Sequence, residues 1–307
     1  MNELISIVIP TKNRTKSLKV VLISYLKQKL VKEIIIVDDG DGIETELYIK
    51  SISTKENKIR YIRNLTNRGS PGSRNIGINL STGKYVFFGE DDVELDTDHL
   101  SILLKHLKES KAHIAAGRII DISPSESMEN AICRANNSKR FPVDKKLLIV
   151  YYSTWMETDI QLPISHALML INKNVFKKVM YDENYKINFW REETDFQLNA
   201  ARNGFKLIYC PHTNIYHRIP NDKGGAHSSN KLTYEFWVIR NNIYFINKNQ
   251  QYIKEQFNIG RTCYLIRFIS YRVIVDLKEV LILFIKKLLL VGKLLRKSLK
   301  ESFKKNK

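Results

Sequence analysis

The chain has 307 residues, of which 43% are hydrophobic and 27% are charged. This length and composition predict a folded protein with a sizeable core, and they exclude a wholly disordered, collagenous or fibrous chain. Lysine and arginine number 50 against 32 for aspartate and glutamate, and the resulting net charge of +18 favours anionic partners such as nucleotides or acidic lipids.

The first 120 residues alternate between apolar strands and helices. Apolar runs of strand type occur at Ile5–Pro10, Glu33–Asp39, Lys58–Asn64 and Lys84–Gly89. Between the first two runs, residues 15–29 place apolar side chains at helical spacing. Strands that are apolar on both faces and alternate with helices predict a mostly parallel sheet covered on each side. The fold class is therefore α/β.

Between residues 120 and 165 the chain is polar and irregular, and we expect a crossover with loops there. The alternation resumes with a strand at 166–171, a helix at 192–203 and a strand at 206–210. Helices are expected from Leu232 onward.

Three cysteines lie far apart in the chain, at Cys133, Cys210 and Cys263. They lack the paired spacing of a zinc site or a disulfide framework. We expect all three to be reduced, buried thiols.

The end of the chain is strongly basic, because residues 261–307 carry +10 of the net charge. This distribution disfavours nucleic acid as a partner of the globular part. Apolar stretches such as Val280–Ile285 are too short to span a membrane, and their mixture with lysine and arginine predicts an amphipathic segment on an anionic membrane surface. The alternative is a helix packed on the protein body. Residues 1–10 show no secretory signal, so we expect a cytoplasmic protein, peripheral on the inner face of the cell membrane.

Polar side chains follow the first two strands where each strand ends. Pro10, Thr11 and Arg14 follow the first strand, and Asp39 follows the second. Because ligands bind beyond the carboxyl ends of strands in an open parallel sheet, we expect these groups to face one crevice. There Asp39 can accept hydrogen bonds from a nucleobase or sugar. A simple turn that ends the strand is an equally good use of Asp39.

Three consecutive carboxylates, Glu90, Asp91 and Asp92, follow the fourth strand. Adjacent like charges repel, so the cluster needs a cation or hydrogen-bond donors to compensate it. Mg²⁺ and Mn²⁺ prefer oxygen ligands and commonly bridge to phosphates. The cluster therefore predicts a divalent metal site. The alternative is a solvated turn that caps the next helix.

A second acidic group, Glu192, Glu193 and Asp195, opens a predicted helix. The helix dipole accounts for acidic residues there, but three carboxylates exceed what capping requires. One of them, held near a sugar hydroxyl, can act as a general base. His217 follows another strand-like run and is a candidate for metal or phosphate contact, although a lone histidine is more often structural.

Taken in order, these motifs resemble those of the family 2 glycosyltransferases. The series is Val8-Ile9-Pro10-Thr11, Val37-Asp38-Asp39-Gly40, Ser73-Arg74-Asn75-Ile76-Gly77, Gly83-Lys84-Tyr85-Val86, Glu90-Asp91-Asp92, Glu192-Glu193-Thr194-Asp195 and His217. The resemblance implies a GT-A fold with a Rossmann-like nucleotide-binding half. It implies a catalytic domain at 1–235, with a donor half at 1–120 and an acceptor half at 121–235. Residues 236–307 would form a basic helical extension.

The resemblance also implies which residues bind the donor. Six are expected at the nucleotide: Pro10, Thr11, Arg14, Asp39, Arg74 and Asp91. Asp39 would face the base, usually uracil, and Asp91 the ribose. Asp92 would hold Mn²⁺ or Mg²⁺ on the diphosphate, assisted by His217.

Glu193 occupies the position that resembles the catalytic base, where many relatives show aspartate. Asp195 and Glu192 are alternates. Trp190, beside this position, is expected either to stack on an acceptor sugar or to belong to the core.

The function implied is metal-dependent inverting transfer of a sugar from a nucleotide-diphosphate donor, usually a UDP-sugar. A glycan or lipid-linked molecule would accept it, in the synthesis of cell-surface polysaccharide or glycoconjugate. Two alternatives stay open. One is a nucleotidyltransferase, which would show a glycine- and lysine-rich loop where this chain has Pro10–Arg14. The other is a non-catalytic, membrane-associated protein that binds nucleotide sugars.

Overall fold

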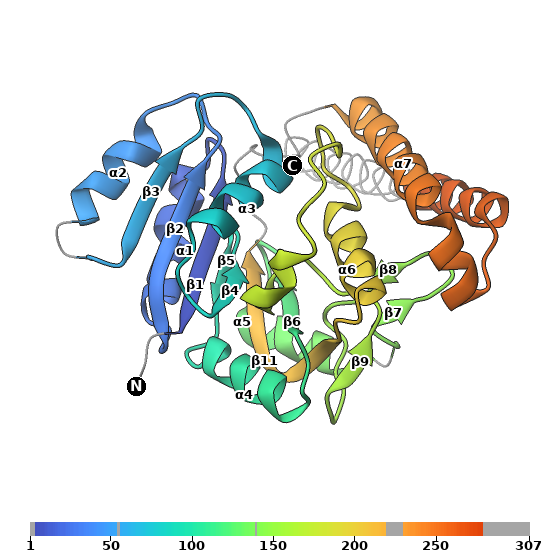
Figure 1. The fold of residues 1–307 in the computed structure, drawn as a ribbon, viewed down its shortest axis with the longest axis horizontal. Coiled ribbons are helices and arrows are strands. Elements are labelled where there is room, and N and C mark those ends of the chain that lie inside the picture. Colours follow the sequence, from blue (N-terminus) through green and yellow to red (C-terminus); the bar gives the residue numbers. More distant parts are fainter. Residues whose placement is uncertain (1–3, 54–55, 139, 219–229, 279–307) are drawn as a thin grey trace, which may run out of the picture.

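The protein, described by a computed structural model over residues 4–53, 56–138, 140–218 and 230–278, is built on one large sheet (Figure 1). Its strand order is β3-β2-β1-β4-β10-β6-β11-β5, and β9 pairs with β11. The strands are β1 (Ile5–Thr11), β2 (Val31–Asp38), β3 (Ile59–Arg63), β4 (Tyr85–Phe88), β5 (Val93–Leu95), β6 (Ile114–Ile122), β9 (Ile160–Leu162), β10 (Met169–Asn172) and β11 (Leu207–Arg218). A small hairpin pairs β7 (Val143–Asp144) with β8 (Ile149–Val150).

Helices cover both faces of this sheet. They are α1 (Thr15–Leu26), α2 (Glu44–Ser53), α3 (Gly69–Leu80), α4 (His99–Glu109), α5 (Met128–Asn136), α6 (Glu192–Arg202) and α7 (Lys231–Phe257), with a 3-10 turn at Lys173–Lys177. Buried side chains of α1 and α4 share one core cluster, and those of α3, α6 and α7 share another. The two clusters lie on opposite faces of the sheet.

Most strands of the sheet run in one direction. β1 pairs in parallel with β2 and β4, and β2 pairs in parallel with β3. β10 is antiparallel to both β4 and β6, so β6 and its parallel neighbour β11 run the same way as β1. The predicted α/β class with a mostly parallel sheet is confirmed. As a result, the carboxyl ends of β1, β2, β4, β6 and β11 lie along one edge.

Alternation along the buried strands divides the core between the two faces. In β1, Ile7 and Ile9 belong to the cluster under α1 and α4, whereas Val8 belongs to the cluster under α3. A β-carbon at Gly77 of α3 would lie 2.2 Å from Cγ1 of Val8. Because Gly77 has no side chain, α3 can pack directly on β1. This close packing fixes the position of α3 relative to the strand ends.

The segment predicted to be irregular contains one helix that the sequence pattern did not reveal. α5 begins after Ser127, whose side chain accepts a hydrogen bond from the backbone N–H of Asn130 at 3.2 Å. Its buried side chains are only Ala131 and Ala135, so the apolar periodicity is weak. β6 also extends to Ile122, two residues beyond the predicted break.

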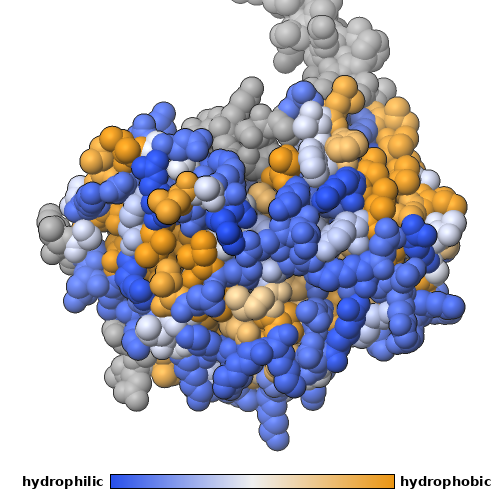
Figure 2. Space-filling view, turned by 45° about the horizontal axis from the view of Figure 1, so that its top comes forward, coloured by the Kyte–Doolittle hydropathy of each residue, from blue (hydrophilic) through white to orange (hydrophobic). Residues whose placement is uncertain are grey.

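The described part of the C-terminal region packs on the helix α6 side of the sheet. α7 places Phe245 and Ile246 in the core cluster that α6 also joins, and the helical residues 261–278 add Tyr264 and Phe268, both fully buried. Exposed apolar side chains cover the outer side of these helices: Leu232, Phe236, Ile243, Ile266, Ile269, Val273, Ile274 and Leu277. Figure 2 shows this hydrophobic surface over α7 at the upper right.

No helix in the described ranges is apolar over the length needed to cross a membrane. The predicted amphipathic segment at Val280–Ile285 lies outside the described residues. Two of the three cysteines are exposed, so the prediction of three buried thiols was wrong for Cys133 and Cys263.

Glu33 of β2 forms hydrogen bonds with the neighbouring strands and with the turn before β4. Replacing it tests how much these contacts stabilise the fold. Its carboxylate accepts hydrogen bonds from Arg60, Thr82 and Ser6, each at 2.7 Å. Burial opposes ionisation, but these donors outweigh it and lower the pKa of Glu33 to about 2. The stabilisation is complete above pH 4.5 and is lost as the pH falls towards 2.

We therefore expect Glu33→Gln to lower the free energy of unfolding by about 2–3 kcal/mol at pH 7. Denaturant titrations between pH 2 and 7 measure the difference, which should shrink below pH 4.5. Glu109→Gln, at a side chain that is 60% exposed, serves as the control. A difference in unfolding free energy between wild type and Glu33→Gln that does not change with pH would contradict this role of Glu33.

Candidate active site

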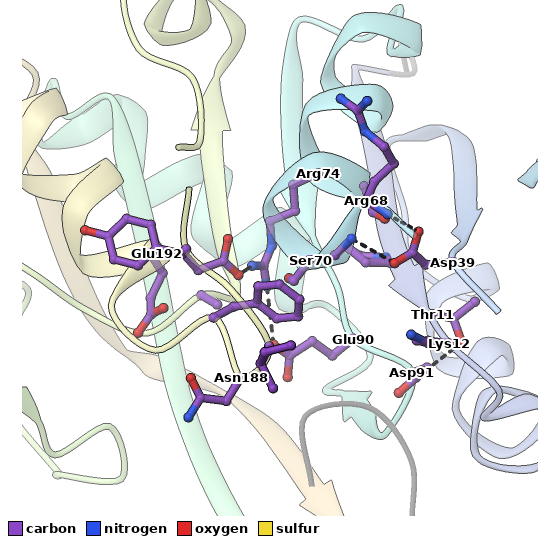
Figure 3. A pocket seen from close by; sticks show the side chains of 18 of the residues that line it. Thr11, Lys12, Asp39, Arg68, Ser70, Arg74, Glu90, Asp91, Asn188 and Glu192 are labelled. Atoms are coloured by element: carbon purple, nitrogen blue, oxygen red, sulfur yellow. Dashed lines mark hydrogen bonds and ion pairs between the residues drawn. The ribbon is translucent and has the colours of Figure 1, made fainter. Parts of the chain in front are cut away.

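A cavity of about 710 Å³ opens at the edge where the strands end. Eleven residues singled out from the sequence line it: Pro10, Thr11, Arg14, Asp39, Arg74, Asp91, Asp92, Trp190, Glu192, Glu193 and His217. They come from the ends of β1, β2, β4 and β11 and from the starts of α3 and α6. Figure 3 shows side chains from both sides of the cavity pointing towards one another. The parallel sheet explains this convergence of residues that are distant in sequence.

Asp39 holds the start of α3 in place. Its Oδ1 accepts hydrogen bonds from Asn64 at 2.9 Å and from the backbone N–H of Arg68 at 2.7 Å, and its Oδ2 accepts one from the N–H of Gly69 at 2.8 Å (Figure 3). Gly69 has a φ of +69°, a conformation that glycine adopts without strain. Oδ2 keeps one free acceptor direction, so Asp39 both shapes the rim of the cavity and can bind a ligand.

Arg14 bridges the two aspartates that follow β4. Its guanidinium lies 2.8 Å from Oδ1 of Asp91 and 2.8 Å from Oδ2 of Asp92. Thr11 donates a further hydrogen bond of 2.6 Å to Asp91. Burial raises the pKa of Asp91 to about 7 even though Arg14 opposes the shift. The negative charge of Asp91 and Asp92 is thus compensated by Arg14, which directly precedes α1, and Asp91 also by the hydrogen bond from Thr11 of β1.

His217 at the end of β11 connects Asp92 to Asp121 at the end of β6. Nδ1 of His217 lies 2.8 Å from Oδ1 of Asp121, and Nε2 lies 3.4 Å from Oδ2 of Asp92. Hydrogen bonds to Asp121 and Asp92 raise the pKa of His217 to about 10. Asp121 orients the ring, and nothing in the sequence pattern marked it except its place after the apolar run of β6.

The carboxylate of Asp92 has the properties expected of a metal ligand. Its Oδ2 faces Arg14 and His217, but its Oδ1 is buried and has no hydrogen-bond partner. A buried unpaired carboxylate oxygen is costly and is satisfied by a hard divalent cation. The donor set of Asp92 oxygen and His217 nitrogen fits such an ion, which would take the place of the Nε2 proton that faces Asp92.

On the opposite side of the cavity, Glu192 forms a buried ion pair with Arg74 (Figure 3). Arg74 also lies 3.5 Å from Glu90 and packs over the rings of Phe88 and Tyr181. Burial raises the pKa of Glu192 to about 7, although Arg74 opposes the shift. The pair links α3 to α6, and both residues line the cavity.

Glu193 is half-buried, lines the same cavity and is placed one residue further into α6. Burial raises its pKa above the ordinary value for glutamate. A carboxylate with a raised pKa that borders a cavity has the properties of a general base.

Asp195, predicted as an alternate base, lies outside the lining of the cavity. Asp195 does not line the cavity and is 2% exposed. Its carboxylate accepts hydrogen bonds of 2.7 Å from Lys248 and from Asn249 of α7. It anchors α7 to α6 and is turned away from the site.

Arg191 fixes the turn that carries these glutamates. Its φ is +77°, an uncommon conformation for a residue with a side chain. Its buried guanidinium donates hydrogen bonds to the carbonyl of Leu147 at 2.8 Å, to Tyr264 at 2.7 Å and to Asn242 at 2.9 Å. The C-terminal helices thus determine the position of Glu192 and Glu193.

Trp190 lies between the cavity and the core. It lines the cavity and also packs against the core cluster. The neighbouring residues 185–189 line the cavity as well, together with Lys12, Arg68 and Ser70. Sequence reasoning did not select these residues, because a loop without periodicity gives no indication of its position.

Residues 6–156 match the family model described as glycosyl transferase family 2. An uncharacterized glycosyltransferase of Methanocaldococcus jannaschii is 24% identical over 259 residues, which are 79% of this chain and 83% of that protein. A GalNAc(5)-diNAcBac-PP-undecaprenol beta-1,3-glucosyltransferase of Campylobacter jejuni is 29% identical over 127 residues. That match covers 41% of each protein, so this chain matches less than half the length of the second relative.

Two solved structures share the fold. S. aureus TarS 1-349 in complex with UDP-GlcNAc superposes with a TM-score of 0.57 at 17% identity, covering 84% of this chain and 74% of that chain. GalNAc-T7 with UDP, GalNAc and Mn²⁺ gives a TM-score of 0.60 at 15% identity, covering 89% and 57%. The predicted GT-A fold is confirmed by these likenesses together with the sheet described above. Residues 6–156 of this chain thus form a family 2 glycosyltransferase domain.

Proposed function

We propose that the protein transfers a sugar, with inversion, from a nucleoside-diphosphate donor to a hydroxyl group of a glycan or lipid-linked acceptor, and that it needs a divalent metal ion. One observation carries the proposal: Asp39, Asp92 and Glu193, from three separate elements, line one cavity. Residues 1–120 supply the donor side, and residues 121–235 supply most of the acceptor side.

The donor side of the cavity is suited to a nucleoside diphosphate. Lys12, Arg14 and Arg68 line it and supply positive charge, which attracts phosphate oxygens. Asp39 retains an acceptor direction for a base or ribose. The solved structures of similar fold were obtained with UDP-GlcNAc and with UDP, GalNAc and Mn²⁺, which supports a UDP-sugar and a divalent ion.

Asp92 and His217 would hold the divalent ion, Mn²⁺ or Mg²⁺. When bound, the ion supplies positive charge that stabilises the departing nucleoside diphosphate. Arg14 keeps Asp91 and Asp92 oriented, and Asp121 holds the imidazole of His217. These contacts prepare the site before the donor arrives.

Glu193 would accept the proton of the acceptor hydroxyl as its oxygen attacks the anomeric carbon. The bond between that carbon and the diphosphate oxygen breaks on the opposite side, so configuration inverts. Burial raises the pKa of Glu193, which makes the carboxylate a stronger base. Trp190 would stack on the acceptor sugar next to this base.

A panel of nucleotide sugars tests the reaction class. We expect release of nucleoside diphosphate with at least one UDP-sugar in the presence of Mn²⁺, and loss of that release with a chelator. Hydrolysis of the donor without acceptor should be slow. If a chelator does not affect the release of nucleoside diphosphate, the proposed metal requirement is wrong. If no donor is turned over, the alternative of a non-catalytic protein is supported.

We further place the enzyme on the cytoplasmic face of the cell membrane, in the synthesis of cell-surface polysaccharide or glycoconjugate. The outer side of α7 and residues 261–278 exposes apolar side chains, and residues 279–307 add a net charge of +7. One relative is named for an undecaprenol-linked acceptor, which supports a lipid-linked substrate.

Deleting residues 279–307 is expected to reduce binding to anionic vesicles at least tenfold, because each basic residue near such a surface contributes about 1 kcal/mol. Co-sedimentation with anionic and with neutral vesicles measures the binding of the full-length and truncated chains. The truncated chain ends at Lys278, because Tyr264 and Phe268 are core residues and have to be kept. Equal binding by both chains would contradict the membrane assignment.

A further inference from the structure

A second cluster of polar side chains lies away from the cavity, where α4, β9 and β11 meet. It contains His106 of α4, Asp159 directly before β9, and Cys210 and His212 of β11. These four residues do not line the cavity. His212 lies five positions before His217 along β11, so the cluster lies on the order of 15 Å from the catalytic edge.

Strand pairing explains why these residues meet. β9 is antiparallel to β11, with Ile160 opposite Tyr209, so Asp159 comes beside Cys210. The register of β11 against β6 shifts between Tyr209 and Asn214, which places Cys210 and His212 in a bulge. α4 packs across this part of β11 and brings His106 onto the same spot.

The donor atoms are already close to one another. Nδ1 of His106, a carboxylate oxygen of Asp159 and Sγ of Cys210 all lie within 4.8 Å of one another. Nδ1 of His106 is 2.8 Å from Oδ2 of Asp159, and Nε2 of His212 is 3.7 Å from Oδ1. The two imidazole rings stack with centroids 4.8 Å apart. Ligand atoms around a tetrahedral zinc ion are roughly 3.3–3.8 Å apart, so small side-chain rotations suffice.

Two features of the cluster are unexplained by its own contacts. Oδ1 of Asp159 is buried and has no hydrogen-bond partner. Cys210 is completely buried in the same cluster, with its Sγ within 4.8 Å of the Asp159 carboxylate and of Nδ1 of His106. A cation bound here would satisfy the carboxylate oxygen and replace the thiol proton. His106 and Asp159 are half-buried, which gives an ion access from solvent.

We propose that His106, Asp159 and Cys210 bind one Zn²⁺ ion, with His212 as the fourth ligand. Imidazole, thiolate and carboxylate together suit zinc, whereas Mn²⁺ and Mg²⁺ prefer the oxygen ligands of the catalytic edge. Four protein ligands leave no open position, so the site is structural and ties α4 and β9 to β11. It is separate from the metal proposed for sugar transfer.

Metal analysis and cobalt substitution of the full chain test this site. We expect about one equivalent of zinc per chain after dialysis, and a thiolate-to-cobalt charge-transfer band when Co²⁺ replaces it. The catalytic edge contains no thiol and cannot produce that band. Cys210→Ser should abolish the band, whereas Cys263→Ser, at an exposed cysteine, should retain it.

His106→Gln provides a second variant, because Cys210→Ser alters a core position. It should weaken zinc binding at least tenfold, measured by competition with a chromophoric chelator. A wild-type cobalt spectrum without the thiolate band would overturn the proposal. A band that persists in Cys210→Ser, or zinc affinity unchanged in His106→Gln, would overturn it as well.

Discussion

Asp92→Asn is expected to lower the rate of sugar transfer about 10³-fold, with little change in melting temperature. Asparagine has the same shape but is neutral, so Arg14 and His217 lose their shared anionic partner. The buried oxygen that lacks a partner also loses the charge needed to hold a divalent cation. Initial rates of nucleoside diphosphate release, taken over a series of Mn²⁺ concentrations, measure the effect.

Asp41→Asn is the matched control, because Asp41 is exposed and follows the end of β2 without lining the cavity. It should keep the wild-type rate. If Asp92→Asn also keeps that rate at limiting Mn²⁺, Asp92 is not a metal ligand. The match of residues 6–156 to the family model would be unaffected by that outcome.

The residues that sequence reasoning placed correctly at the cavity lie at strand ends. Thr11, Asp39, Asp92 and His217 each follow a buried apolar run, and parallel strands end at one edge. A local pattern is enough here because parallel strands that are far apart in the sequence end close together at the same edge of the sheet. The α/β class followed from the same alternation.

Other features depended on tertiary contacts that no local pattern encodes. Asp195 belongs to the same acidic run as Glu193, yet Lys248 and Asn249 of α7 hold it outside the cavity. Asp121 became part of the site only because β11 pairs with β6 and brings His217 beside it. The cysteine spacing likewise gave no sign of the histidines that surround Cys210, because they come from a helix and a bulge.

Glu193→Gln is expected to lower kcat by about 10²–10⁴-fold and to leave the KM for the donor nearly unchanged. The amide cannot take a proton, but it keeps the size of the side chain in the half-buried position. Because burial raises the pKa of Glu193, the wild-type kcat should fall as the pH drops through that raised pKa. The variant should lose this acid limb of the profile, since its residual rate no longer depends on that group.

The neighbouring carboxylates supply the controls for this assignment. Asp195→Asn should keep most of the turnover but lower the melting temperature, because it weakens contacts with Lys248 and Asn249. Glu192→Gln disrupts the ion pair with Arg74, so it should affect donor KM and stability together. A wild-type kcat in Glu193→Gln, combined with loss of the acid limb in Glu192→Gln, would transfer the role of base to Glu192. Loss of a proton-transfer group changes kcat and its pH profile, whereas loss of a purely structural contact changes stability. The three variants therefore separate the two roles.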